Sequence, residues 1–109
     1  MTTLDDIIAH AKTLPGVTEG PPVRAARRAV AFKVAGKSFL GVETDGMVTL
    51  AFPEEAGLTL CEGRPETFQA IHGPQGRFMG IRLDPARLDT TEARQLVESA
   101  HRFRRDHKR

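Results

Sequence analysis

In the middle of the chain, hydrophobic positions recur at every second residue in three short runs. The runs cover residues 30–34, 38–43 and 47–52, and they are separated by short polar segments at 35–37 and 44–46. A period of two is typical of a strand with one buried face. The second polar segment contains Asp-Gly, which favours a tight hairpin turn. The pattern therefore predicts three consecutive antiparallel strands.

Two stretches near the ends of the chain carry hydrophobic residues at helical spacing instead. They predict helices over residues 3–14 and 90–105, with Thr3 as an N-cap of the first and Asp89 as that of the second. Weaker patterns predict three further elements, which are a short helix over 53–62, a helical turn from residue 64 that carries Phe68 and Ile71, and a fourth strand over 77–83.

This order of elements predicts an α+β fold, a two-layer sandwich. About four antiparallel strands form the sheet, and the two terminal helices pack on one of its faces. Strand alternation then assigns side chains to faces. Those expected toward the helices are Phe32, Leu40, Leu50 and Ile81. Those expected on the open face are Lys33, Phe39, Thr49, Phe78 and Arg82.

Length and composition are those of one globular domain. The chain has 109 residues, of which 39% are hydrophobic and 28% charged, and its formal net charge is +2. A chain of this size can bury a core of its own. A lone cysteine cannot form an internal disulfide, and no segment resembles a membrane span or a signal peptide. We therefore expect a single cytoplasmic domain over residues 1–109, without membrane contact.

Basic residues are concentrated in two places. Arg24, Arg27 and Arg28 follow an extended passage that Pro21-Pro22 predicts, and a basic tail begins at about residue 101. Such clusters favour anionic partners, although basic tails also occur simply as solvated surface.

Candidate residues for catalysis or metal binding do not form a recognisable set. Cys61 and His72 lie in separate segments, and Asp5, Asp6 and His10 share one polar helix face without further ligands at a suitable spacing. We therefore expect no catalytic residues, no metal and no cofactor, and we expect a protein that is not an enzyme.

Three segments together resemble the MmcQ/YjbR-like family. They are residues 14–19 (Leu-Pro-Gly-Val-Thr-Glu), residues 32–39 (Phe-Lys-Val-Ala-Gly-Lys-Ser-Phe) and the end of the last predicted strand, Ile-Arg-Leu-Asp at 81–84. The resemblance covers nearly the whole chain. It implies a CyaY-like α+β fold, described as a double-wing DNA-binding domain, and hence DNA as a partner.

Two functional hypotheses follow. In the first, the protein binds DNA phosphates through basic side chains, with Lys37 in the first hairpin turn. The predicted contacts are Lys33, Lys37, Arg77, Arg82, Arg102, Arg104 and Arg105. In the second, the open sheet face with Phe39 and Phe78, or the loop 72–76, binds a protein or a small ligand, and a homodimer is one form of this.

Overall fold

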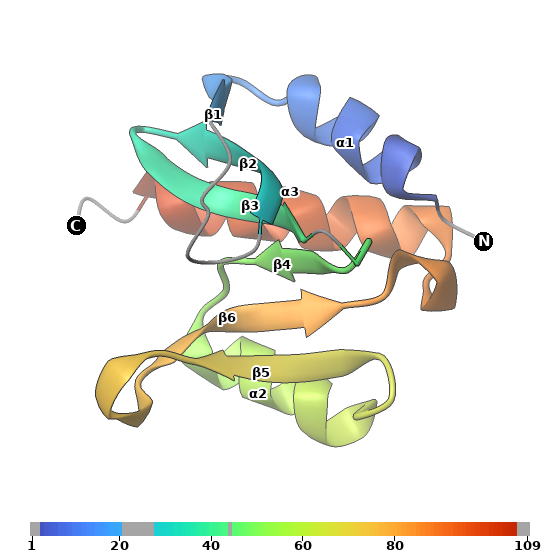
Figure 1. Cartoon of the computed structure of the whole chain (residues 1–109), viewed down its shortest axis with the longest axis vertical. Helices are drawn as coiled ribbons and strands as arrows, with labels where there is room; N and C mark the ends of the chain where they lie inside the picture. Colours follow the sequence, from blue (N-terminus) through green and yellow to red (C-terminus); the bar gives the residue numbers. More distant parts are fainter. Residues whose placement is uncertain (1–2, 21–27, 44, 107–109) are drawn as a thin grey trace.

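The structure is a computed structural model, and it describes residues 3–20, 28–43 and 45–106. The predicted extended passage at Pro21-Pro22, the side chains of Arg24, Arg27 and Arg28, and the tail residues 107–109 lie outside the described part. The elements, in chain order, are α1 (Leu4–Lys12), β1 (Val17–Gly20), β2 (Arg28–Val34), β3 (Lys37–Glu43), β4 (Val48–Leu50), α2 (Glu54–Gly63), β5 (Phe68–His72), the 3₁₀ turn η2 (Pro74–Gly76), β6 (Phe78–Leu83), the 3₁₀ turn η3 (Pro85–Arg87) and α3 (Thr90–Asp106) (Figure 1).

The strands form one six-stranded sheet in the order β1-β2-β3-β4-β6-β5, with every neighbouring pair antiparallel. The three consecutive strands and the strand near residue 80 are confirmed, but the expected number of about four strands is wrong. β1 is short and mostly polar, so its alternation is weak. The predicted helical turn from residue 64 is present as one turn, in which the Phe68 N–H donates to the Arg64 carbonyl at 2.9 Å. The placement of Phe68 and Ile71 in a helical segment is wrong, because both lie in β5 although they are spaced as on a helix.

Both terminal helices begin at side-chain caps. At α1, the Thr3 hydroxyl accepts from the Asp6 backbone N–H at 3.2 Å, and the Asp6 carboxylate accepts from the Thr3 N–H at 3.1 Å. The bonds to Thr3 lower the pKa of Asp6 below its ordinary value. At α3, the Asp89 carboxylate accepts from the Glu92 N–H at 2.7 Å. These bonds satisfy donors that a helix leaves without an internal partner.

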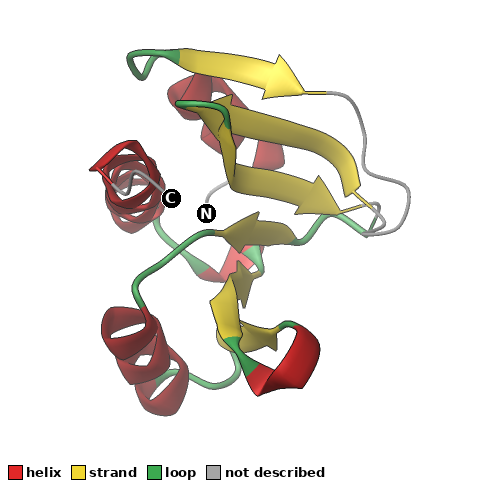
Figure 2. Ribbon diagram, turned by 90° about the vertical axis from the view of Figure 1, so that its left-hand side faces the viewer, coloured by secondary structure: helices red, strands yellow, loops and turns green. Residues whose placement is uncertain are grey.

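The helices form a second layer on one face of the sheet. α2 and α3 lie on the same side of the sheet in Figure 2, where α3 packs against β3 and α2 packs against β5 and β6. α1 packs against α3 and the edge strand β1. The α+β two-layer prediction is therefore confirmed, with α2 joining the terminal helices in the same layer.

A row of large apolar side chains crosses the sheet beneath this layer. Phe32 pairs with Leu40, Leu40 with Leu50 and Leu50 with Ile81, and none of the four is more than 2% exposed. Residues directly opposite each other in an antiparallel pair share a face, so the row confirms the predicted core face. The next row, which includes Thr49 and Arg82, lies on the opposite face as predicted.

The placement of Phe39 and Phe78 on the open face is wrong. Phe39 is 1% exposed and its ring meets the His101 ring of α3 edge-on at 5.4 Å. Phe78 is half-buried beneath α2, where a Cβ added at Gly57 would lie 2.5 Å from the Phe78 Cζ atom. Each error has the same cause. A β-bulge adds one residue to the strand and shifts the alternation from that point onward.

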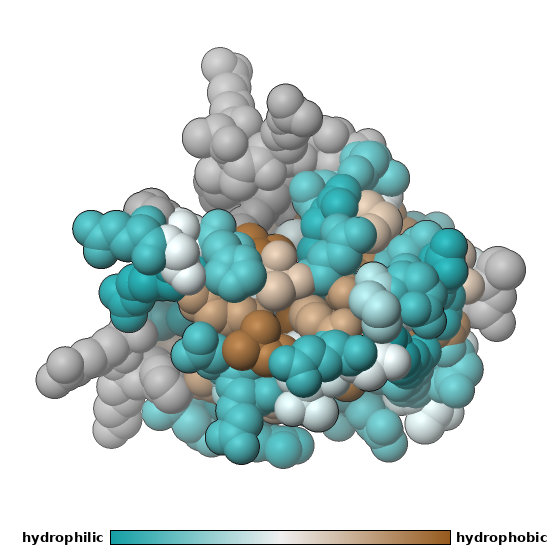
Figure 3. All heavy atoms as spheres, turned by 90° about the horizontal axis from the view of Figure 1, so that it is seen from below, coloured by the Kyte–Doolittle hydropathy of each residue, from teal (hydrophilic) through white to brown (hydrophobic). Residues whose placement is uncertain are grey.

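The surface on the side of β5 and α2 carries a limited apolar area bordered by hydrophilic side chains (Figure 3). Among the described residues, Met79 is the large hydrophobic side chain that stands out as exposed, at 51%. No helix within the described ranges has the length and apolar character needed to cross a membrane.

Candidate anion-binding pocket

A pocket of about 440 Å³ lies at the end of the sheet where β3 and β6 begin. β4 has only three residues and separates these two strands, so it pairs with β3 at 40–42 and with β6 at 81–83. Beyond that short bridge the first residues of β3 and β6 have no strand between them. We call this space the β3–β6 pocket. Its lining residues are Lys37, Ser38, Phe39, Leu40, Gly41, Thr49, Leu50, Ala51, Ile71, Met79 and Arg104.

The two bulges stand on opposite walls of this pocket. In β3, Phe39 is the extra residue between the pairs Phe32–Leu40 and Lys33–Ser38. In β6, Met79 is the extra residue, because Ile71 pairs with Gly80 and His72 with Phe78. Bulges bend a strand and redirect its side chains, and they are frequent beside functional sites.

Gly80 permits the close approach of β6 to β4 that forms the base of the pocket. Its φ is +157°, and a Cβ added there would lie 2.3 Å from the Leu50 carbonyl oxygen. No real side chain tolerates that distance, so only glycine fits at this position.

Among the described residues, the charged side chains that line the pocket are both positive. They are Lys37 and Arg104, and no Asp or Glu of the described ranges lines the pocket with them. The Arg104 Nε–H donates to the Ser38 carbonyl at 3.1 Å, and the guanidinium lies 5.7 Å from the centre of the Phe103 ring. Within the described ranges Arg104 has no carboxylate partner. Arg104 is thus held at its Nε, while its Nη groups make no hydrogen bond to the described part of the chain.

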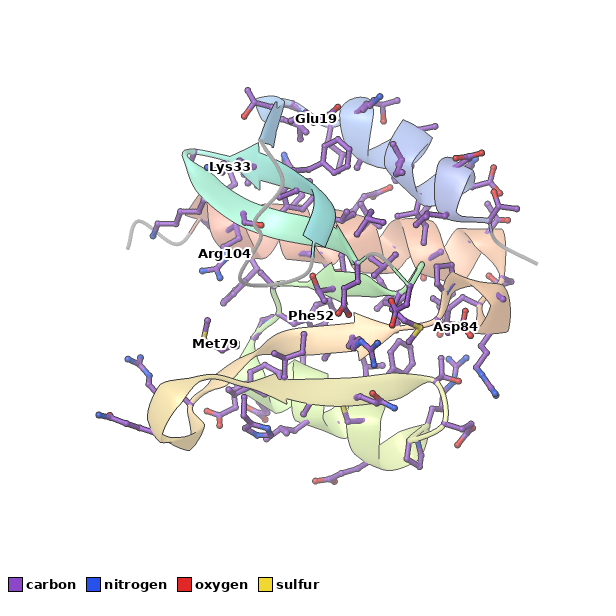
Figure 4. All side chains as sticks on the ribbon, viewed as in Figure 1. Glu19, Lys33, Phe52, Met79, Asp84 and Arg104 are labelled. Atoms are coloured by element: carbon purple, nitrogen blue, oxygen red, sulfur yellow. The ribbon has the colours of Figure 1, made fainter. Side chains whose placement is uncertain are left out.

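Apolar side chains complete the pocket. Ile71 and Met79 come from β5 and β6, and Leu50 from β4. Figure 4 shows Arg104 and Met79 at the same end of the sheet, one on each side of the space between β3 and β6. The pocket therefore combines a cationic side with an apolar side.

Of the predicted phosphate contacts, Lys37 and Arg104 meet in this pocket. Lys33 lies on β2 as the register partner of Ser38, and Arg77 is exposed in the connection from β5 to β6. In the described part of the chain, neither Lys33 nor Arg77 forms an ion pair. Neither lines the β3–β6 pocket, but each neighbours a residue that does: Lys33 is paired with Ser38, and Arg77 precedes Met79 by two residues.

Arg82 is placed differently. Its Nε donates to Glu43 at 2.5 Å, and its two Nη groups donate to Asp45 at 2.6 Å and to Gln69 at 3.3 Å. We call these four residues the Arg82 cluster. Hydrogen bonding to Glu43, with the charges of both carboxylates, raises the pKa of the Arg82 guanidinium. One cation faces two carboxylates here, so the cluster has a net negative charge.

The remaining predicted contacts lie on α3 away from the pocket. The Arg105 Nε donates to Asp106 at 3.0 Å. Arg102 lines a separate pocket of about 390 Å³ between α2 and α3, together with Asp106 and Phe103. Of the predicted basic residues, Lys37 and Arg104 therefore line the β3–β6 pocket. Arg82, Arg102 and Arg105 instead lie next to carboxylates.

The other candidate residues do not assemble into a catalytic or metal-binding set in the described ranges. His72 ends β5, and its ring meets Phe78 edge-on at 6.3 Å. Burial raises the pKa of the Cys61 thiol, which lowers its thiolate fraction. No group of three or more potential metal ligands was found among the residues described. His10 instead bonds Glu98 of α3 at 2.8 Å.

Sequence reasoning missed the apolar side of the pocket. Strand alternation over the predicted strand 77–83 puts Met79 on one face with Ile81 and Leu83, whereas the structure leaves Met79 51% exposed. Gly80 is the residue near position 79 that could have indicated a bulge, because a glycine inside a predicted strand is a known sign of one.

A family model named YjbR matches residues 12–103. The chain belongs to the YjbR family. No curated protein matches it significantly. Among solved structures, the YjbR-family chain is similar to the crystal structure of Deinococcus radiodurans protein DR2400, a DUF419 domain, with a TM-score of 0.75 at 18% identity. The match covers 94% of this chain and 78% of the other, and it shows a shared fold.

Proposed function

We propose that this YjbR-family protein is a non-enzymatic DNA-binding protein that contacts phosphates at the β3–β6 pocket. One observation carries the proposal: Lys37 and Arg104 line the same pocket, and among residues 3–20, 28–43 and 45–106 no carboxylate lines it with them. Anionic oxygens are the natural partners of such a site, because a guanidinium held at one nitrogen offers its other donors in a fixed plane.

Two further cations extend this surface. Lys33 on β2 is the register partner of the pocket residue Ser38, and Arg77 lies two residues before the pocket residue Met79. A phosphate chain crossing the end of the sheet would meet Lys33 or Arg77 next to the central pair. Lys37, at the start of β3, directly follows the tight turn in which Ala35 and Gly36 have positive φ values of 53° and 79°. This tight turn therefore holds Lys37 in a fixed position for a phosphate contact.

The test is a fluorescence anisotropy titration with labelled DNA oligonucleotides, single-stranded and duplex, over a series of salt concentrations. About three phosphate contacts predict a slope of log affinity against log salt of roughly −2 to −3. Lys37→Gln should reduce the steepness by about 0.7 to 0.9, the contribution of one phosphate.

Lys12→Gln is the matched control, because Lys12 lies on α1 and faces Glu19 at 4.0 Å. It should leave the slope and the affinity unchanged. Absence of binding at micromolar protein and low salt, or equal effects of the two lysine substitutions, contradicts the proposal.

The hypothesis of self-association through the open sheet face loses its supporting observation. That hypothesis required Phe39 and Phe78 to be exposed, whereas one ring is covered by α3 and the other by α2. Substitutions of either residue should therefore affect the stability of the fold.

A further inference from the structure

The β3–β6 pocket forms a cavity, whereas a surface that binds only a phosphate backbone needs no cavity. Its volume of about 440 Å³ lies within the range of small-ligand sites. A phosphate on Lys37 and Arg104 would occupy the cationic side only. The space beside Ile71, Leu50 and Met79 would stay unfilled.

The apolar side suits a flat, polarisable group. Met79 is 51% exposed even though it belongs to a strand whose other apolar residues are buried or, in the case of Phe78, half-buried. A methionine thioether adapts to the shape of its neighbour and makes favourable contacts with aromatic rings. Ile71 from the neighbouring strand adds an apolar surface beside it.

Backbone irregularities on both walls of the pocket accompany the exposure of Met79. Met79 has no register partner on β5, and the next residue, Gly80, lies so close to β4 that a Cβ there would be 2.3 Å from the Leu50 carbonyl oxygen. On the opposite wall, the bulge at Phe39 displaces the start of β3, from which Lys37 extends. Two independent irregularities thus shape one pocket.

We propose that this pocket binds a single unstacked nucleotide, with its phosphate at Arg104 and Lys37 and its base against Met79 and Ile71. The inference rests on the proposed function for the source of the nucleotide, which is one residue of a single strand. A free mononucleotide presents the same phosphate and base. The protein would then prefer single-stranded DNA to duplex, since a paired base cannot leave the stack without cost.

The experiment compares three labelled probes: a short oligothymidylate, the same length of abasic strand and a duplex. Removal of the bases keeps the phosphates, so it isolates the contribution of the apolar side. We expect roughly fivefold tighter binding of oligothymidylate than of the abasic strand, as a favourable contact of a thioether with one base ring provides. Met79→Ala should remove most of that difference and leave abasic binding unchanged.

Met47→Ala is the matched control, because Met47 lies in the connection from β3 to β4, outside the pocket lining. It should preserve the difference between the two strands. Equal affinity for all three probes overturns the single-nucleotide inference while phosphate binding stands. The same holds if Met79→Ala weakens oligothymidylate and abasic strand equally.

Competition with free thymidine monophosphate separates the two sources of the ligand. With the base effect present, displacement of the labelled strand assigns the pocket to nucleotides in general, and lack of displacement assigns it to nucleotides within a strand. Binding of the mononucleotide without binding of any strand supports the pocket's ligand and overturns the proposed DNA function. If no probe binds, both proposals fail.

Discussion

Two arginines of this small protein have opposite surroundings. Arg82 lies near the end of β6 and donates to Glu43, Asp45 and Gln69 of the neighbouring elements. Arg104 extends from the last turns of α3 to the sheet, and its hydrogen bond to the described part of the chain is made by its Nε, to the Ser38 carbonyl. The first side chain has its donors satisfied by the protein, and the second retains donors for a ligand.

The difference shows that the position of a cation in a sequence says little about its role. Glu43 and Asp45 are separated from Arg82 by 39 and 37 residues, and they reach it across β4. Their carboxylates make the Arg82 cluster a structural feature of the sheet. At the β3–β6 pocket no carboxylate from the described part of the chain is present, and there a guanidinium becomes a candidate for binding.

The largest effect is expected at Gly80, which lies in β6 between Met79 of the β3–β6 pocket and Arg82 of the Arg82 cluster. Gly80→Ala places a Cβ against the Leu50 carbonyl and must push β6 away from β4. We expect a loss of about 3 kcal/mol in the free energy of unfolding, measured with chemical denaturant. Gly63→Ala is the control, because a Cβ there meets nothing within 4 Å. Equal stability of the two variants would mean that the strands are not in such close contact.

Loss of the Arg82 side chain should cost stability and leave binding intact. Arg82→Gln removes the partner of the Glu43 carboxylate, whose side chain is only 19% exposed. Leaving a hydrogen-bonded charge of this kind without its partner costs about 2 kcal/mol. We expect this loss in a denaturant titration, together with an affinity for single-stranded DNA within about twofold of wild type. A large loss of affinity at full folding would show that the Arg82 cluster takes part in binding.

Removing negative charge from the cluster should have a smaller and opposite effect. Asp45 is exposed at 54%, so its bond to Arg82 contributes little to stability. Asp45→Asn makes the cluster neutral and should raise DNA affinity at low salt by roughly threefold. Anisotropy titrations at low and high salt measure this, since the gain should vanish as salt screens the charges. A gain that persists at high salt contradicts an electrostatic cause.

Much of the fold could be predicted from local periodicity. α1, α3 and the hairpin β2–β3 carry regular patterns over several residues. Each of their predicted ends lies within two residues of the end in the structure. β1 and β5 were missed because short strands take their stability from pairing with a neighbour, which no local pattern records.

The candidate site was predictable only in part. Lys37 and Arg104 were among the predicted phosphate contacts, yet nothing local distinguished them from Arg82 or Arg105. That distinction depends on cross-strand register and on which carboxylates come near. Phe39 and Phe78 were assigned to the wrong face because a bulge changes alternation by one residue and leaves little trace in the sequence.

The most direct test of the phosphate site compares two adjacent arginines of α3. Arg104 lines the β3–β6 pocket without a carboxylate partner among the described residues, whereas Arg105 donates to Asp106. The slope of log affinity against log salt for single-stranded DNA should become less steep by about 0.7 in Arg104→Gln and stay at the wild-type value in Arg105→Gln. Equal slopes for the two variants, or a change in Arg105→Gln alone, would contradict phosphate binding at this pocket.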